Sequence, residues 1–164
     1  MNIGIIGLGA VGSALQKGFK YLDHEVVGYD IKHPDTKIED VLDTEIVYIV
    51  VGTPTGPNDE CDLTAVNSVI SQLSKLEYKG LVALKSTVEP GTTNRLSSLH
   101  SNLDICFVPE FLRERCAYED FVYNNNILVV GTDNDEHYNL ILKSHGSLPV
   151  HKVKVSLIEA ELMK

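Results

Sequence analysis

The chain has 164 residues, 43% of them hydrophobic, which is enough for one ordinary globular domain and too few for two. With 14 Lys and Arg against 23 Asp and Glu, its formal net charge of -9 disfavours electrostatic binding of nucleic acid or of an anionic membrane. No apolar run approaches the roughly 18 residues of a membrane span, and no charged region precedes the first apolar run as in a signal sequence. We therefore expect a single cytoplasmic domain with neither nucleic acid nor membrane as a partner.

Cysteine and histidine usage indicates no metal centre and no disulfide framework. The three cysteines, Cys61, Cys106 and Cys116, are odd in number and widely spaced, and none belongs to a CxxC pair. The six histidines never fall at a metal-ligand spacing such as HxxxH. We expect free thiols in a reducing compartment and no metal ligand.

Short runs rich in Val and Ile recur along the chain, with helical patterns such as those at 13–22 and 63–76 between them. Several runs are apolar at consecutive positions, which is typical of strands buried on both faces of a parallel sheet. The predicted strands are 3–6, 25–30, 45–52, 81–86, 104–109, 127–132 and a possible last one at 150–155. The alternation predicts an α/β fold with a Rossmann-like, doubly wound, mostly parallel sheet.

Two features set the expected limits of this domain. The interval 31–44 is too short for a complete helix, strand and helix, so the third strand of the first mononucleotide-binding half is expected to be abbreviated or missing. Near the end, Ser156 and Glu159 have the spacing of a capping box, which predicts a helix start. We therefore divide the chain into a dinucleotide-binding domain, 1–155, and the beginning of a further helix, 156–164.

The glycine motif "GLGAVG" at 7–12 lies between the first predicted strand and a helical stretch, which is the setting of a dinucleotide site. In that setting Gly7 allows the tight turn, Gly9 lets the backbone approach the pyrophosphate, and Gly12 permits close packing of helix on strand. Val11 belongs to the same loop and is expected to contact the cofactor. Asp30 closes the second strand, where its carboxylate can bind the ribose hydroxyls and would repel a 2′-phosphate, so NAD is favoured over NADP.

Ligands of open α/β sheets bind beyond the carboxyl ends of the strands, and three stretches stand out there. They are "VGTPTGP" (51–57), "KSTVEPGTT" (85–93) and "VPEFLRERCAYEDF" (108–121). Together with the glycine motif and the terminal "EAELMK", they give the chain a specific resemblance: it resembles the nucleotide-sugar 6-dehydrogenases, which include the UDP-glucose and GDP-mannose dehydrogenases. Members of this family oxidise the C6 hydroxymethyl group of a nucleotide sugar to a carboxylate in two NAD-dependent steps, through a thiohemiacetal and a thioester on a cysteine.

The resemblance implies roles for individual residues. Thr53 and Thr87 would lie along NAD, with Thr87 also near the reacting carbon. Glu110 would be the general base for thioester hydrolysis, Glu114 a contact to cofactor and substrate, and Lys164 the lysine that stabilises the developing oxyanion. A base of this kind should lie at a strand end in a partly dry site where burial can raise its pKa, and Glu114 would share its face if a helical turn follows. Without the resemblance, the carboxylates could be an exposed structural pair, Thr87 a turn residue and Lys164 a solvated terminus.

The chain also departs from the family. It corresponds to the N-terminal third or so, without the GGxCxPKD motif that supplies the nucleophile, and Arg115 and Cys116 stand where the family usually has Gly and a variable residue. Cys61 and Cys106 are better explained as incidental or buried thiols than as replacements. We expect the chain to bind NAD without completing the reaction on a UDP- or GDP-sugar.

Three alternatives stay open at this point. The chain could be a non-catalytic NAD-binding module, one subunit of a split enzyme, or another Rossmann dehydrogenase of the 3-hydroxyacyl or 6-phosphogluconate type. The last shares the glycine motif but does not account for "KSTVEPGTT" or "PEFLRE". A homodimer or a second subunit is possible in each case, and the motifs do not name the sugar nucleotide.

Overall fold

The computed structural model describes residues 1–56, 59–148 and 150–164. Within them seven strands form one sheet: β1 (Asn2–Ile6), β2 (Glu25–Tyr29), β3 (Ile46–Ile49), β4 (Leu81–Leu84), β5 (Asp104–Phe107), β6 (Ile127–Gly131) and β7 (His151–Val155). The helices are α1 (Ala10–Tyr21), α2 (Thr64–Lys75), α3 (Thr92–Leu99), α4 (Ala117–Glu119), α5 (Asp135–His145) and α6 (Leu157–Leu162). Two 3₁₀ turns, η1 (Ile38–Val41) and η2 (Glu114–Cys116), and a π-helical turn, η3 (Asp120–Asn124), complete the elements.

The strands lie in the order β2-β1-β3-β4-β5-β6-β7. The first five run parallel, β6 pairs antiparallel with β5 through the single pair Phe107 and Gly131, and β7 runs parallel to β6. This arrangement confirms the predicted doubly wound, mostly parallel sheet, including the possible last strand. The chain leaves β1 to β2 on one side and returns to β3 on the other, which makes the carboxyl ends of β1 and β3 the topological switch point.

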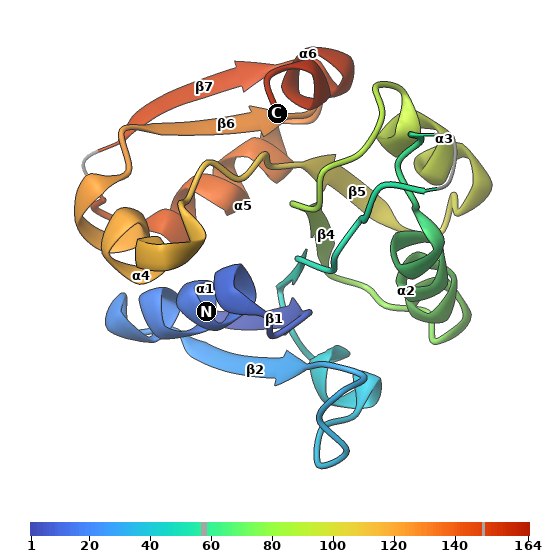
Figure 1. Ribbon diagram of the computed structural model, residues 1–164, viewed down its shortest axis with the longest axis horizontal. Helices are drawn as coiled ribbons and strands as arrows, with labels where there is room; N and C mark the ends of the chain where they lie inside the picture. Colours follow the sequence, from blue (N-terminus) through green and yellow to red (C-terminus); the bar gives the residue numbers. More distant parts are fainter. Residues whose placement is uncertain (57–58, 149) are drawn as a thin grey trace.

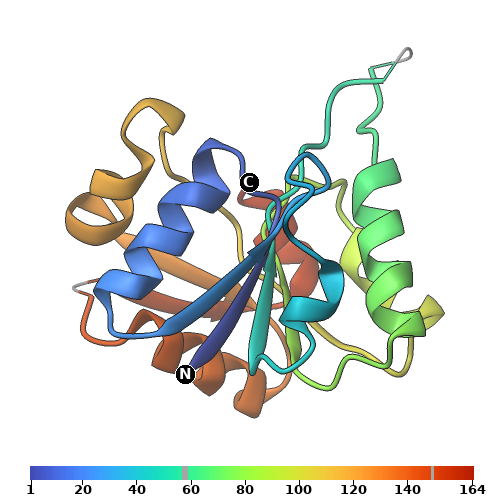
Figure 2. The same cartoon turned by 90° about the horizontal axis from the view of Figure 1, so that it is seen from below.

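The five strands other than β2 and β7 bury alternate residues on opposite faces of the sheet, because side chains along a strand point to the two sides in turn. Val47 and Ile49 of β3 join the cluster beneath α2, whereas Ile46 and Tyr48 of the same strand join the cluster beneath α1 and α5. Figure 2 shows α1 on one side of the sheet and α2 on the other. Burial on both faces accounts for the continuous apolar runs of the sequence.

The interval 31–44, which the structure describes completely, holds the 3₁₀ turn η1 and no strand. The prediction of an abbreviated third-strand region is therefore confirmed, and β2 forms the edge of the sheet. Ile38 and Val41 of η1 are buried and contribute to the same cluster as α2. The short turn η1 therefore covers part of this face of the sheet, in the place where a complete helix would otherwise pack.

Helix α6 begins with the predicted capping box: the Ser156 side chain accepts from the Glu159 backbone N–H, and the Glu159 carboxylate accepts from the Ser156 N–H. The helix packs closely on β6, because a Cβ at Gly131 would lie 2.5 Å from the Cβ of Ala160, which is fully buried. Figure 1 shows α6 and the C-terminus above β6. The division of the chain at 155 and 156 stays a prediction.

No helix in the described part of the chain is both long and apolar enough to cross a membrane.

Candidate functional site

The glycine turn between β1 and α1 has the backbone geometry that only glycine tolerates. Gly7 adopts a φ of +97°, and a Cβ there would lie 2.6 Å from the carbonyl oxygen of Val50. A Cβ at Gly12 would lie 1.8 Å from the carbonyl oxygen of Gly7, so α1 can approach β1 this closely only without a side chain. A Cβ at Gly9 would meet nothing within 4 Å, which leaves open space over the turn.

Asp30 follows β2 and holds the glycine turn directly. Its Oδ2 accepts a hydrogen bond from the Leu8 N–H at 2.7 Å, and its Oδ1 accepts one from the Lys32 N–H at 2.9 Å. Burial acts to raise the pKa of Asp30, but these two backbone donors and the charges of His33 and Lys32 outweigh it, so the net pKa lies below the ordinary value. The carboxylate is therefore ionised at neutral pH beside the turn.

A cavity of about 330 Å³ opens at the switch point of the sheet. The ends of β1, β2 and β3 and one side of α2 line it, with residues that include Gly7, Gly9, Asp30, Gly52 and Ser68. Its volume falls in the range of small-molecule sites, and its place outside the carboxyl ends of the strands is the usual one for a nucleotide. The glycine turn and Asp30 thus face one shared cavity.

The loops after β3 and β4 are tied to each other. The Cys61 thiol donates to the carbonyl oxygens of Thr87 at 3.4 Å and Thr53 at 3.9 Å, and the Ser86 hydroxyl donates to the carbonyl oxygen of Val51 at 2.7 Å. Thr53 is half-buried and Thr87 is exposed, so both predicted contact residues lie on neighbouring loops at one edge of the sheet. Pro57, the last residue of the motif at 51–57, and Asn58 lie outside the described residues.

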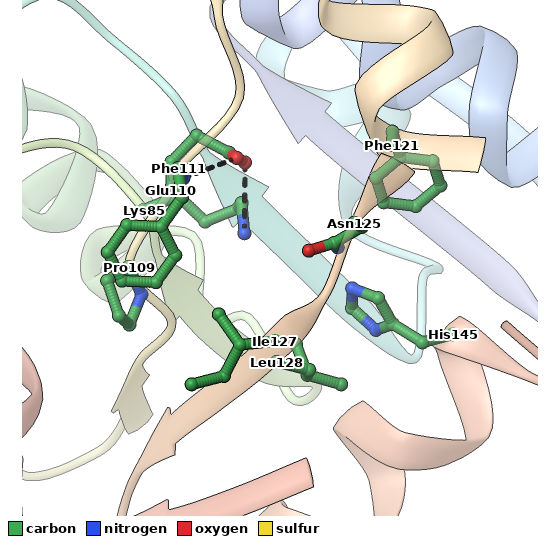
Figure 3. Close-up of a pocket in the computed structure, with 9 residues that line it drawn as sticks. All are labelled: Lys85, Pro109, Glu110, Phe111, Phe121, Asn125, Ile127, Leu128 and His145. Atoms are coloured by element: carbon green, nitrogen blue, oxygen red, sulfur yellow. Dashed lines mark hydrogen bonds and ion pairs between the residues drawn. The ribbon is translucent and has the colours of Figure 1, made fainter. Parts of the chain in front are cut away.

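Glu110 lies after β5 between two lysines. Its side chain is buried, and its Oε2 lies 3.2 Å from the ammonium of Lys85, which is 5% exposed (Figure 3). Its Oε1 accepts from the backbone N–H groups of Phe111 and Leu112 at 2.8 and 2.9 Å. The amine of Lys164 donates to the Glu110 carbonyl oxygen. The structure therefore brings together two of the three predicted catalytic residues and adds Lys85 to them.

Lys164 ends the chain and is exposed as a whole residue, yet its amine reaches back to Glu110. Partial burial of the amine lowers the pKa of Lys164, and the positive charge of Lys85 acts in the same direction, while Glu110 opposes both. The ammonium of Lys164 is therefore a stronger acid than that of a solvated lysine.

A second cavity, of about 10 Å³, lies beneath Glu110. Figure 3 shows Asn125 and His145 facing it from one side and Lys85 and Glu110 from the other. A space of this size holds at most one water molecule, and these polar groups could bind it. Burial lowers the pKa of His145 to about 3, with Lys85 acting in the same direction, so the imidazole is neutral at neutral pH.

The condition under which Glu114 would share a face with Glu110, a helical turn between them, is not met. No helical turn spans residues 110–113, and η2 begins only at Glu114 itself. Glu110 and Glu114 therefore share no helical face, and Glu114 is exposed whereas Glu110 is buried. Residues 110–113 form no regular element, and the backbone N–H groups of Phe111 and Leu112 donate to the Glu110 carboxylate.

Sequence reasoning missed two buried charges, Lys85 and Glu161. Lys85 directly follows the apolar strand β4, and a lysine in such a place is rarely buried unless it is paired, which is a signal for a partner. Glu161 is 3% exposed, and its spacing from Lys164 gave no sign of its own contacts. Neither residue could be assigned a partner without the fold.

The three cysteines are free. Burial raises the pKa of Cys106 to about 12, although Lys85 lowers it, so this thiol is no nucleophile at neutral pH. Cys61 and Cys116 are half-buried, and the Cys116 thiol donates to the carboxylate of Asp120. No cluster of three His, Cys, Asp or Glu side chains suited to a metal ion occurs within residues 1–56, 59–148 and 150–164.

A mostly parallel sheet with a glycine turn, a strand-end carboxylate and a cavity at its switch point defines a dinucleotide-binding domain of the Rossmann class. The family model described as UDP-glucose/GDP-mannose dehydrogenase family, NAD binding domain, matches residues 34–145, which is more than half of the chain. The chain therefore belongs to this family, and its cofactor is NAD. The matched range includes the loops after β3, β4 and β5 but not the glycine turn.

Individual relatives extend the match to the whole chain. The UDP-glucose 6-dehydrogenase of Rickettsia bellii is 30% identical in an alignment that covers 100% of this chain and 47% of that protein. The solved UDP-glucose dehydrogenase of the archaeon Pyrobaculum islandicum is 28% identical with a TM-score of 0.88, covering 99% of this chain and 48% of that one. The GDP-mannose dehydrogenase of Pseudomonas aeruginosa, 24% identical, shares the fold with a TM-score of 0.86 over 100% of this chain and 48% of that one.

The chain thus spans about half the length of these relatives, somewhat more than the third expected from the motifs.

Proposed function

We propose that this chain forms the NAD-binding half of a nucleotide-sugar 6-dehydrogenase, an enzyme that oxidises the C6 hydroxymethyl group of a UDP- or GDP-sugar to a carboxylate. The observation that carries the proposal is the cluster at the end of β5, where buried Glu110 contacts both Lys85 and Lys164. A purely cofactor-binding module has no need of a buried carboxylate paired with a buried lysine, because burying charges is costly.

The cavity at the switch point fits the adenosine part of NAD. The ionised carboxylate of Asp30 can accept hydrogen bonds from ribose hydroxyls, and the open space over Gly9 leaves room for a pyrophosphate against the N-terminus of α1. We assign Val11, Thr53, Thr87 and Glu114 to further cofactor contacts on the strength of the family motifs. When bound, NAD accepts the hydride of the oxidation.

Glu110 is suited to the role of a general base. A carboxylate has about four acceptor positions, and three donors use three of them: the N–H groups of Phe111 and Leu112 and the ammonium of Lys85. One position on Oε2 is left for the proton of an attacking water. The amine of Lys164 lies over the Glu110 carbonyl, where its positive charge can stabilise an oxyanion that forms beside it.

The proposal includes the protein that completes the site. Ile158, Leu162 and Met163 of the α6 region are exposed apolar side chains, which supports a covering contact from a second subunit or from another part of the same polypeptide. Capture of a second chain that carries GGxCxPKD would support a split enzyme, and a homodimer is the alternative assembly. The three free thiols are in keeping with a cytoplasmic location.

The test uses the purified 164-residue chain with NAD and, separately, UDP-glucose and GDP-mannose, with NADH followed by fluorescence. We expect no accumulation of NADH, because the thiolate nucleophile that the family uses is not supplied by Cys61, Cys106 or Cys116. Formation of UDP-glucuronate by this chain alone would contradict that expectation. In an assembly that does turn over, Glu110→Gln should abolish hydrolysis of the acyl intermediate, whereas Glu119→Gln, an exposed carboxylate nearby, should leave turnover unchanged.

A further inference from the structure

Glu161 has no part in the proposed reaction, yet it is among the most buried charged residues of the described chain, at 3% exposed. Its Oε2 accepts from the Gly91 N–H at 2.6 Å, and its Oε1 accepts from the N–H and the hydroxyl of Thr93 at 2.8 and 2.6 Å. These donors belong to the first turn of α3, whose cap residue Gly91 has no side chain to satisfy them. Glu161 therefore supplies, from another helix, the cap that α3 lacks.

The same contact fixes the end of α6. The helix has only six residues, and a helix this short is not stable without packing. Ala160 anchors its middle on Gly131 of β6, and Glu161 anchors its last turn on α3. Lys164 follows three residues after Glu161, so its amine can remain over the Glu110 carbonyl only while that last turn stays in place.

Glu161 also connects two parts of the candidate site. Gly91 ends the loop after β4 that carries Thr87, and Lys164 reaches the loop after β5 that carries Glu110. A single buried carboxylate thus contacts the segment next to Thr87 on one side and holds the turn before Lys164 on the other. Nothing in the family motif itself required these contacts, because they depend on α3 and α6 meeting in the fold.

We propose that Glu161 is a positioning residue, whose clamp on the first turn of α3 holds the amine of Lys164 against Glu110. This inference rests on the proposed function for its catalytic meaning, but its structural content can be tested independently. The competing explanation is that Glu161 only caps α3 and that Lys164 finds Glu110 without it. The two differ in what happens to Lys164 when the carboxylate is removed.

The experiment compares Glu161→Gln with Glu159→Gln, a matched change of an exposed carboxylate on the same helix. The side-chain resonance of Lys164 is titrated by NMR in each protein, and exchange of the Gly91 and Thr93 amides is measured in parallel. Lys85 and Glu110 are the charged groups that act on Lys164 and are unchanged in both variants. In Glu161→Gln, amide exchange should accelerate by roughly tenfold, and the pKa of Lys164 should rise toward 10.5 as the amine returns to water.

Glu159→Gln should leave the titration of Lys164 as in the wild type. If Glu161→Gln does not fold, Thr93→Val removes one of the three hydrogen bonds and should produce the same changes to a smaller extent. Faster amide exchange with an unchanged Lys164 titration would overturn the proposal and leave Glu161 as a helix cap. Calorimetry of NAD binding distinguishes failure of the proposed function from failure of the positioning role of Glu161. If the wild-type chain does not bind NAD, the result counts against the proposed function and not against the contacts of Glu161.

Discussion

At the scale of single residues, the pair formed by Lys85 and Glu110 is the costly feature of this site. Both side chains are almost completely buried, and their charges compensate each other at 3.2 Å. A buried pair adds little net stability, but loss of one partner leaves an uncompensated charge in the interior. A buried pair such as Lys85 and Glu110 is therefore better explained by a binding or catalytic role of one of its charges than by packing alone.

This asymmetry gives a prediction for Lys85→Met. Removing the ammonium should destabilise the fold by roughly 3–5 kcal/mol, because the Glu110 carboxylate is left buried without a counter-charge. The double variant Lys85→Met with Glu110→Gln should recover part of this loss, since it removes both charges. Urea unfolding followed by circular dichroism measures both values. A cost below about 1 kcal/mol for Lys85→Met would mean that the pair is not buried as described.

Residues whose role depends on local sequence were predictable, whereas residues whose partners are distant along the chain were not. Gly7, Gly12 and Asp30 have strong local signatures, and the structure gives the glycines the conformation and close packing that those signatures imply. Lys85 and Glu161 lie within motifs at 85–93 and 159–164, but their partners lie far along the chain: Glu110 for Lys85, and the first turn of α3 for Glu161. Sequence spacing predicts local geometry and not the meeting of distant elements.

At the scale of elements, the segment that follows Glu110 forms an arch, residues 113–120, which is closed by contacts between Arg113 and Asp120 at the start of η3. Asp120 is buried and accepts from the backbone N–H and from the guanidinium of Arg113, at 3.1 Å, 2.8 Å and 2.6 Å. The hydrogen bonds from the Arg113 side chain, followed by that from its backbone, hold the pKa of Asp120 far below its ordinary value. The carboxylate thus stays ionised and keeps both ends of the arch together.

We therefore expect Asp120→Asn to loosen residues 113–120, because an amide cannot accept the bidentate contact of Arg113. Limited proteolysis within that arch should accelerate, while Glu119→Gln, an adjacent exposed carboxylate, should leave the cleavage rate unchanged. Because the pKa of Asp120 is lower in the folded protein than the value of 3.8 in the unfolded chain, its carboxylate stabilises the folded state fully above pH 3.8. That stabilisation is lost only as the pH falls below 3.8. The resistance of the wild-type arch to proteolysis should therefore be constant between pH 5 and pH 8. Equal cleavage of both variants would contradict this account of the arch.

The elements themselves were largely predictable, and the exceptions have physical causes. Strands buried on both faces contain continuous apolar runs, so β1, β3, β4, β5 and β6 were recognisable from composition. The reversal of β6 relative to β5 was not, since burial on both faces looks the same in either direction. The irregular segment 110–113 was also not predictable, because the contacts of Glu110 with Lys85 and Lys164 join parts of the chain that are distant in sequence.

At the scale of the whole molecule, a neutral histidine is buried in the core between α5 and the sheet. His145 packs against Phe19 and Phe121, and its Nδ1 contacts the carbonyl oxygen of Ile141 at 3.0 Å. Burial lowers its pKa to about 3, from 6.5 for an ordinary histidine. Between these values the unfolded chain binds a proton that the folded chain does not, so acid favours unfolding.

The stability contributed by neutral His145 should be complete above pH 6.5 and should fall by roughly 1.4 kcal/mol per pH unit below it. Urea unfolding at pH 7 and pH 5 measures this slope. His145→Gln should reduce the difference between the two values, while His151→Gln, an exposed histidine, should keep it. An equal slope in wild type and His145→Gln would show that other groups set the acid sensitivity.

The central claim is that the whole domain presents one NAD site at the switch point, with Asp30 on the ribose. Calorimetric titration of the 164-residue chain with NAD and NADP tests it most directly, with Asp30→Ala and the exposed control Asp35→Ala measured alongside. We predict binding of NAD, much weaker binding of NADP, and a loss of roughly 1–3 kcal/mol of NAD affinity in Asp30→Ala only. Equal affinity for NAD in Asp30→Ala and wild type, or no binding of NAD at all, would contradict the account.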